Sequence, residues 1–199
     1  ENFARMCRRT FRDKANIAKL LTKLEAQQGI SYAPMQRQTL ELALKNQLLV
    51  ITGGPGTGKT TSIRAILAMF DEIGIKTLLC APTGRAAKRM TELTGRDAAT
   101  VHRMLGAKFD EDNDRVVFTK DESDRLDCDA VILDECSMVD ICLMDALLRA
   151  LPPDARLIMV GDADQLPSVG PGNVFSALIR SQVVATVRLT EIFRQTGDS

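Results

Sequence analysis

The stretch ITGGPGTGKTT, residues 51–61, places four glycines and a proline between an apolar run and a segment with helical spacing. The apolar run at 48–51 is typical of a buried strand, and residues 61–70 repeat apolar side chains at helical intervals. Glycine is favoured where the backbone takes a positive φ or touches another group, so four of them indicate a ligand against the main chain. Because the unpaired amides of such a loop and of the first helical turn point to one place, the stretch predicts an anion-binding site.

The spacing of Gly53, Gly58, Lys59 and Thr60 is that of a P-loop. In this motif the loop amides cradle phosphates, the lysine reaches the β and γ oxygens, and the hydroxyl ligates magnesium. A dinucleotide-binding G-x-G-x-x-G does not fit, because Lys59 stands where the third glycine should be. We therefore expect ATP and Mg²⁺, with nucleotide contacts from Gly54, Pro55, Gly56, Thr57, Gly58, Lys59, Thr60 and Thr61.

The composition is that of a soluble globular domain with an appendage: 199 residues, 45% hydrophobic and 26% charged. No apolar run is long enough to span a bilayer, so we expect no membrane partner. The formal net charge is zero, and a nucleic-acid partner would have to be held by a local basic patch. An odd number of cysteines without a C-x-x-C pair indicates reduced, buried thiols in a cytoplasmic protein and argues against zinc; they are Cys7, Cys80, Cys128, Cys136 and Cys142.

Strands and helices alternate after a short helical segment, for which the apolar spacing predicts an amphipathic helix at 13–28. Pro34 suits the first turn of a second helix that ends near Asn46. Near-continuous apolar strands alternating with helices indicate an α/β fold, a parallel sheet covered by helices on both faces. The expected strands are 48–52, 76–81, 130–134, 155–161 and 184–190, and the expected helices between them are 58–72, 84–94, 140–151 and 173–180.

The acidic segment 108–129 interrupts this alternation. The short apolar pieces at 108–109 and 116–118 flank the turn-rich run at 110–114, a pattern that favours a small hairpin inserted between layers of the sheet.

Polar residues that follow buried strands are candidates for catalysis, because ligands of such sheets sit at the carboxyl ends of the strands. Asp134 and Glu135 come directly after the apolar strand at 130–134, where one carboxylate can hold magnesium opposite Thr60 and the other can orient and deprotonate a water. Gln165 follows the next strand, and its uncharged amide can contact a γ-phosphate and report its presence.

The order of the segments resembles the motifs of superfamily-one helicases, most closely the RecD-like group, and hence a RecA-like P-loop NTPase fold. The resemblance covers residues 36–195 and rests on Gln36 followed by GGPGTGKT, APTGRAAKRM, TVHRML, DECSMVD, GDADQLPSVGPG and LTEIFRQ. Superfamily-two helicases usually carry D-E-x-D/H, whereas this chain has Asp134-Glu135-Cys136-Ser137.

The resemblance implies roles that spacing alone does not assign. Gln36 is similar to the glutamine that reads adenine, and Arg194 resembles the arginine that reaches the γ-phosphate when two motor domains close. With Lys59, Asp134, Glu135 and Gln165, Arg194 completes the expected catalytic set. Single-stranded DNA is expected to contact Thr83, Arg85, Thr100 and His102.

The expected organisation is a helical lead-in at 1–30, a first RecA-like motor domain at 31–191 with a hairpin insertion at 106–129, and the start of a connection to a second motor domain at 192–199. The resemblance thus implies part of an ATP-dependent DNA helicase with 5′→3′ polarity, acting alone or in a RecBCD-type complex. This chain alone should then hydrolyse ATP slowly. The alternatives are another P-loop ATPase, such as that of a conjugative relaxase or a regulatory switch, and a non-catalytic nucleic-acid-binding module.

Overall fold

A computed structural model of the chain describes residues 2–11, 17–166 and 170–190. Its centre is a six-stranded sheet in the order β3-β2-β6-β7-β1-β8. Every pair of neighbours in this sheet is parallel, as the alternation of strands and helices predicts. The strands are β1 (Leu48–Gly53), β2 (Thr77–Ala81), β3 (Ala98–Thr100), β6 (Ala130–Leu133), β7 (Arg156–Gly161) and β8 (Ala185–Leu189).

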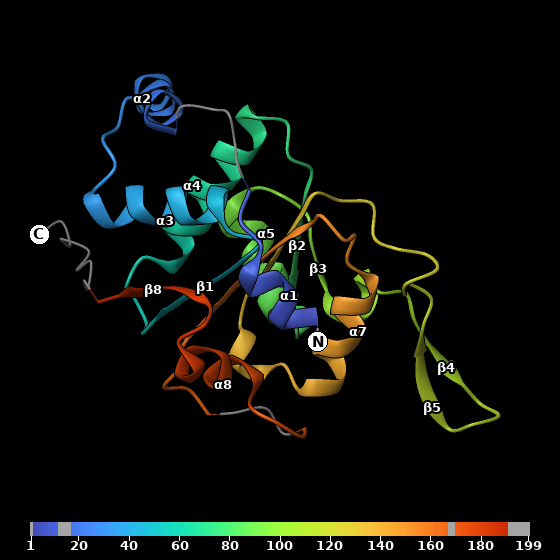
Figure 1. The fold of residues 1–199 in the computed structure, drawn as a ribbon. Coiled ribbons are helices and arrows are strands. Elements are labelled where there is room, and N and C mark those ends of the chain that lie inside the picture. The colour runs from blue at the N-terminus through green and yellow to red at the C-terminus, as the bar shows by residue number, and fades with distance from the viewer. Residues whose placement is uncertain (1, 12–16, 167–169, 191–199) are drawn as a thin grey trace, which may run out of the picture.

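Helices cover both faces of the sheet, which confirms the predicted α/β architecture (Figure 1). One apolar cluster joins the sheet to α2 (Ile17–Gln28), α3 (Pro34–Lys45), α4 (Lys59–Glu72) and α5 (Gly84–Thr94). The other cluster joins its opposite face to α1 (Asn2–Arg8), α6 (Val101–Met104), α7 (Ile141–Ala150) and α8 (Val174–Ser181). Burial on both faces explains why these strands are apolar throughout instead of alternating with polar residues.

The hairpin is present, but its expected place between layers of the sheet is wrong. Strands β4 (Ala107–Asp110) and β5 (Arg115–Phe118) pair antiparallel in a sheet of their own, which protrudes from the body of the molecule (Figure 1). Phe109 and Val116 are exposed there, whereas Phe118 packs against the core.

Four elements were not predicted: α1, β3, α6 and the short 3₁₀ helix Cys136–Met138. Strand β3 is only three residues long and half-buried, so it lacks the apolar run by which the other strands are recognised. The predicted helix at 13–28 is described from Ile17 onward as α2, and residues 12–16 lie outside the described part of the chain.

The strand order fixes where the candidate residues gather. Strand β7 lies between β1 and β6, so the loops that follow these three strands emerge side by side at one edge of the sheet. These loops carry the glycine-rich stretch, Asp134 with Glu135, and Gln165. The geometry thus assembles residues more than 100 positions apart in the sequence into one site.

Candidate functional site

The glycine loop exposes its backbone to open space. Gly56 and Gly58 take positive φ values of 72° and 92°, and Gly58 directly precedes α4. A Cβ added to Gly54 or Gly56 would meet no atom within 4 Å. The main chain is therefore accessible to a ligand at these positions.

Gly53 has a different reason to be glycine. A Cβ at this residue would lie 2.4 Å from Thr57 Oγ1 and 2.9 Å from the carbonyl oxygen of Leu189 on the neighbouring strand. The Thr57 hydroxyl in turn donates to the carbonyl oxygen of Gly54 at 2.7 Å. Gly53 thus serves the packing of the loop against β8.

The ammonium group of Lys59 is held by the loop itself. Its Nζ donates to the carbonyl oxygens of Gly53 at 2.6 Å and Gly54 at 2.8 Å. These contacts hold the charge beside the open backbone, where exchange of a carbonyl for a phosphate oxygen needs only a side-chain movement.

Asp134 follows β6 as predicted and is half-buried. Its Oδ1 accepts the Glu135 backbone N–H at 2.8 Å. Burial raises the pKa of the Asp134 carboxyl above its usual value, while that hydrogen bond and the nearby charges of Lys59 and Arg89 oppose the rise.

Glu135 is held in the left-handed region, with φ 53° and ψ 42°. A non-glycine residue in this conformation carries a backbone cost, and such residues cluster at functional sites. Burial first, and the neighbouring Asp134 charge second, raise the pKa of the Glu135 carboxyl. A base with a raised pKa accepts a proton more readily at neutral pH.

Gln165 is positioned by a residue from the loop after β6. The hydroxyl of Ser137, in the short 3₁₀ helix Cys136–Met138, donates to Gln165 Oε1 at 3.0 Å. This bond leaves the amide N–H₂ of Gln165 available to donate to an anion.

One cavity of about 460 Å³ joins these groups. It brings Lys59, Thr60, Asp134, Glu135 and Gln165 together, as the sequence predicts. It also includes Arg89, which the sequence reasoning missed. The lining residues are Pro55, Gly56, Gly58, Lys59, Thr60, Thr61, Ile63, Ala86, Arg89, Met90, Leu93, Thr94, Asp134, Glu135 and Gln165.

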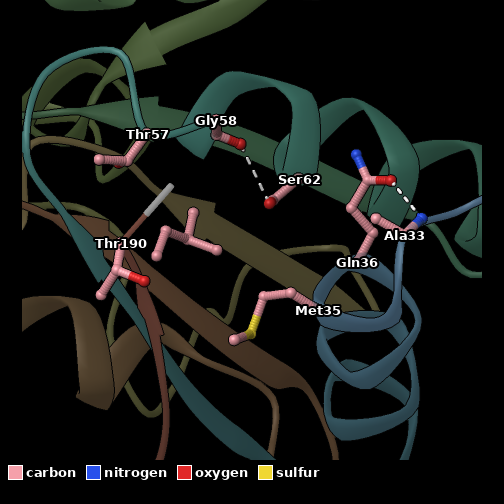
Figure 2. A pocket seen from close by; sticks show the side chains of 8 residues that line it. Ala33, Met35, Gln36, Thr57, Gly58, Ser62 and Thr190 are labelled. Atoms are coloured by element: carbon pink, nitrogen blue, oxygen red, sulfur yellow. Dashed lines mark hydrogen bonds between the residues drawn. The ribbon is translucent and has the colours of Figure 1, made fainter. Parts of the chain in front are cut away.

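Gln36 does not line this cavity but a smaller, mostly apolar one of about 60 Å³ beside the glycine loop (Figure 2). The side-chain Oε1 of Gln36 accepts the Ala33 backbone N–H at 2.9 Å, which caps the start of α3. The cavity is lined by Ala33, Met35, Gln36, Thr57, Gly58, Ser62, Leu189 and Thr190.

The four residues expected at DNA lie where two neighbouring strands end and the next helices begin. Strands β2 and β3 pair in parallel with Ala81 opposite Thr100. Thr83 and Thr100 each cap a helix, accepting the N–H of the third residue beyond, at 3.2 Å and 3.1 Å. Arg85 is exposed, and so is His102, whose ring also packs on Phe118 of the hairpin with centroids 5.8 Å apart.

The predictions for Arg194 and for the cysteines have different outcomes. Arg194 and the expected connection at 192–199 lie outside the described residues. The prediction of buried thiols is confirmed for Cys80, Cys128 and Cys136. It is wrong for Cys142, which is exposed on α7, and Cys7 is only half-buried. Burial raises the pKa of the Cys128 thiol to about 11.

The residues present fit a nucleotide with magnesium. Gly54 and Gly56 leave room for phosphates against the main chain, and Lys59 supplies a cation beside them. The hydroxyl of Thr60 and the carboxylate of Asp134 share the cavity, and oxygen donors of this kind suit Mg²⁺.

Comparison with known protein families decides the family of this chain. The sequence model of the family described as "AAA domain" matches residues 36–171. The chain belongs to the AAA domain family. This AAA domain is 42% identical over 173 residues to the ATP-dependent RecD2 DNA helicase of Deinococcus radiodurans, a match that covers 87% of the chain and 23% of that relative. It is 40% identical over 167 residues to the RecBCD enzyme subunit RecD of Mycobacterium tuberculosis, covering 72% of the chain and 28% of the relative.

A crystal structure of Bacteroides Pif1 bound to single-stranded DNA has a similar fold, with a TM-score of 0.58 and 26% identity over 84% of this chain and 44% of that one. The resemblance of this AAA domain to RecD-like superfamily-one helicases is confirmed. The domain spans about a quarter of the length of the curated relatives it matches.

None of the helices in the described part of the chain is long and apolar enough to cross a membrane.

Proposed function

We propose that this chain is the ATP-binding first motor domain, residues 31–191, of an ATP-dependent DNA helicase of the RecD-like group. The observation that supports this most is the single cavity in which the glycine loop, two carboxylates and Gln165 meet. The RecD2 relative is named an ATP-dependent DNA helicase and the RecD relative a subunit of the RecBCD enzyme, which favours this function over that of another P-loop ATPase.

In this proposal ATP lies across the glycine loop. The adenine lies in the small cavity beside Gln36, and the phosphates lie against the amides from Gly54 to Thr61 with Lys59 at the β and γ oxygens. Thr60 and Asp134 would hold Mg²⁺, which would neutralise negative charge on the phosphate oxygens.

Glu135 is the base of the proposed hydrolysis. It orients a water and takes its proton as the water oxygen bonds to the γ-phosphorus, and the bond from that phosphorus to the ADP oxygen breaks. Gln165, held through Ser137, donates from its amide to the γ-phosphate or the water and so distinguishes ATP from ADP. Arg194 is proposed to contact the γ-phosphate when a second RecA-like domain closes.

Single-stranded DNA is the proposed second ligand. Thr83 and Arg85 begin α5, where a hydroxyl, a guanidinium and free helix amides suit a phosphate of the strand backbone, and Thr100 with His102 offers a further contact on the adjoining strand end. We propose 5′→3′ movement in the cytoplasm, with the protein acting alone or in a RecBCD-type complex. The helical lead-in at 1–30 and the connection at 192–199 remain part of the proposed organisation.

The test is titration calorimetry of MgATP with the chain and its Lys59→Ala variant. We expect wild type to bind and the variant to lose binding while its melting temperature is unchanged, because Lys59 is a phosphate clamp and not a core residue. Lys88→Ala, which removes an exposed charge of α5 outside the cavity, is the matched control and should bind as wild type does. Unchanged MgATP affinity of Lys59→Ala would refute the proposal.

A further inference from the structure

Arg89 lies on the face of α5 that borders the large cavity. Ala86, Arg89, Met90, Leu93 and Thr94 all line it, and their spacing of three and four residues places them on one side of the helix. Helix α5 packs beside α4, the helix that begins with Lys59 (Figure 1). Two helices thus present a basic side chain to the same cavity.

The guanidinium of Arg89 is exposed and has no ion-pair partner within 4 Å in residues 2–11, 17–166 and 170–190. Its charge nevertheless acts on both carboxylates, because it lowers the pKa of Asp134 and of Glu135 against the effect of burial. Arg89 is therefore near the carboxylates of Asp134 and Glu135 but forms an ion pair with neither.

The balance of charges in the large cavity indicates a role for Arg89. Its described lining includes two carboxylates, Asp134 and Glu135, and two cations, Lys59 and Arg89. MgATP is itself an anion, so a bound nucleotide adds negative charge next to the carboxylates. Lys59 alone would leave this charge uncompensated, and the guanidinium of Arg89 is the further cation that the cavity supplies.

We propose that Arg89 binds the terminal phosphate of the nucleotide from within this motor domain. The inference rests on the proposed function and adds a residue that selects the triphosphate over the diphosphate. The terminal phosphate is the partner because Asp134 and Glu135 flank it in the proposed arrangement, and Arg89 lines the same cavity as both. In the proposed arrangement the α- and β-phosphates already accept hydrogen bonds from the loop amides and from the start of α4.

The side-chain chemistry supports a directed contact. A guanidinium presents paired N–H donors that match two oxygens of one phosphate, whereas a lysine offers only a point charge. Because Arg89 has no ion-pair partner in the described residues, it can turn to a phosphate without breaking such a pair. This contact is made within one domain, unlike that proposed for Arg194.

The test compares the affinities of MgATP and MgADP by calorimetry for the wild-type chain, Arg89→Ala and Arg89→Lys, with Lys88→Ala as the control of equal charge on the same helix. We expect Arg89→Ala to weaken MgATP about tenfold or more, as for the loss of a charged hydrogen bond, and MgADP less than about twofold. Arg89→Lys should recover part of the MgATP affinity, and Lys88→Ala should match wild type.

Equal weakening of MgATP and MgADP by Arg89→Ala, or no weakening of either, would overturn the assignment to the terminal phosphate. Melting temperatures equal to wild type show that the exposed side chain was removed without damage to the fold. The proposed function fails separately: a wild-type chain that binds neither nucleotide overturns both proposals, whereas wild-type binding that Lys59→Ala abolishes and Arg89→Ala leaves intact overturns only this one.

Discussion

Gly53 and Gly54 are adjacent, yet their replacement by alanine should impair different properties. Gly53→Ala should lower the stability of the fold, and Gly54→Ala should weaken MgATP binding. Neither has a positive φ, so alanine brings no left-handed backbone strain at either position. At Gly53 the new methyl meets Thr57 Oγ1 at 2.4 Å and the Leu189 carbonyl oxygen at 2.9 Å, and the latter is backbone that cannot rotate away. At Gly54 the methyl meets nothing within 4 Å and enters the space proposed for phosphate.

The expected magnitudes follow from these contacts. Overpacking of this kind costs about 1–3 kcal/mol, and at about 2–4 °C per kcal/mol for a domain of this size Gly53→Ala should lower Tm by about 2–12 °C. Gly54→Ala should change the free energy of unfolding by less than about 0.5 kcal/mol, as a surface substitution does. It should weaken MgATP binding by about tenfold or more, because the methyl occupies ligand space.

Thermal melting without ligand and calorimetric titration with MgATP measure the two effects separately. Gly53→Ala combined with Thr57→Ala is the control, since it removes the shortest contact but leaves the one to Leu189 and should recover only part of the lost Tm. A lower Tm for Gly54→Ala equal to that of Gly53→Ala would refute the reasoning, as would unchanged MgATP affinity of a well-folded Gly54→Ala.

Three further predictions concern the proposed catalytic base, the pH dependence that it causes, and the DNA contact. In a longer protein that carries both motor domains, Glu135→Gln should lower hydrolysis by about 10²–10⁴-fold and leave MgATP binding in place, because the amide cannot take the proton; steady-state turnover beside calorimetry checks this. In the same protein the raised pKa of Glu135 should move the acid limb of kcat/KM above pH 4.5, the ordinary value for this carboxyl, since the base works only when deprotonated; a limb at or below that pH in a pH–rate profile would contradict it. Arg85→Ala should weaken binding of single-stranded DNA and reduce the slope of log affinity against log salt by about one phosphate contact, with ATP affinity unchanged; an identical slope would remove Arg85 from the strand.

Most of the sheet and the phosphate site could be predicted because their signals are local. A buried strand shows as an apolar run, and the glycine loop with Lys59 and Thr60 is a contiguous pattern. Strand β3 was missed because its three residues show no such run. The predicted position of the hairpin was wrong because two short apolar pieces around a turn indicate that a hairpin forms but not where it lies in the fold.

Arg89 could not be selected from the sequence, because its importance depends on which helix packs beside the loop. A weak signal existed in the spacing of Ala86, Arg89, Met90 and Leu93, which puts an arginine on an otherwise apolar helix face. The hydrogen bond that the Ala33 N–H donates to Gln36 is likewise a property of the folded chain, since the resemblance pointed to the glutamine without its helix-capping contact.

Gly58 lines both cavities, so the apolar cavity beside Gln36 and the charged one beside Asp134 adjoin at the glycine loop. In the proposed binding mode the two cavities are half-sites, one for the base and one for the polyphosphate of ATP. Neither half of a nucleotide need bind tightly by itself, because the ribose that joins them presents the second half at a high effective concentration once the first is in place. In these terms ATP is a bivalent ligand, and the short glycine loop sets the reach that its two ends must match.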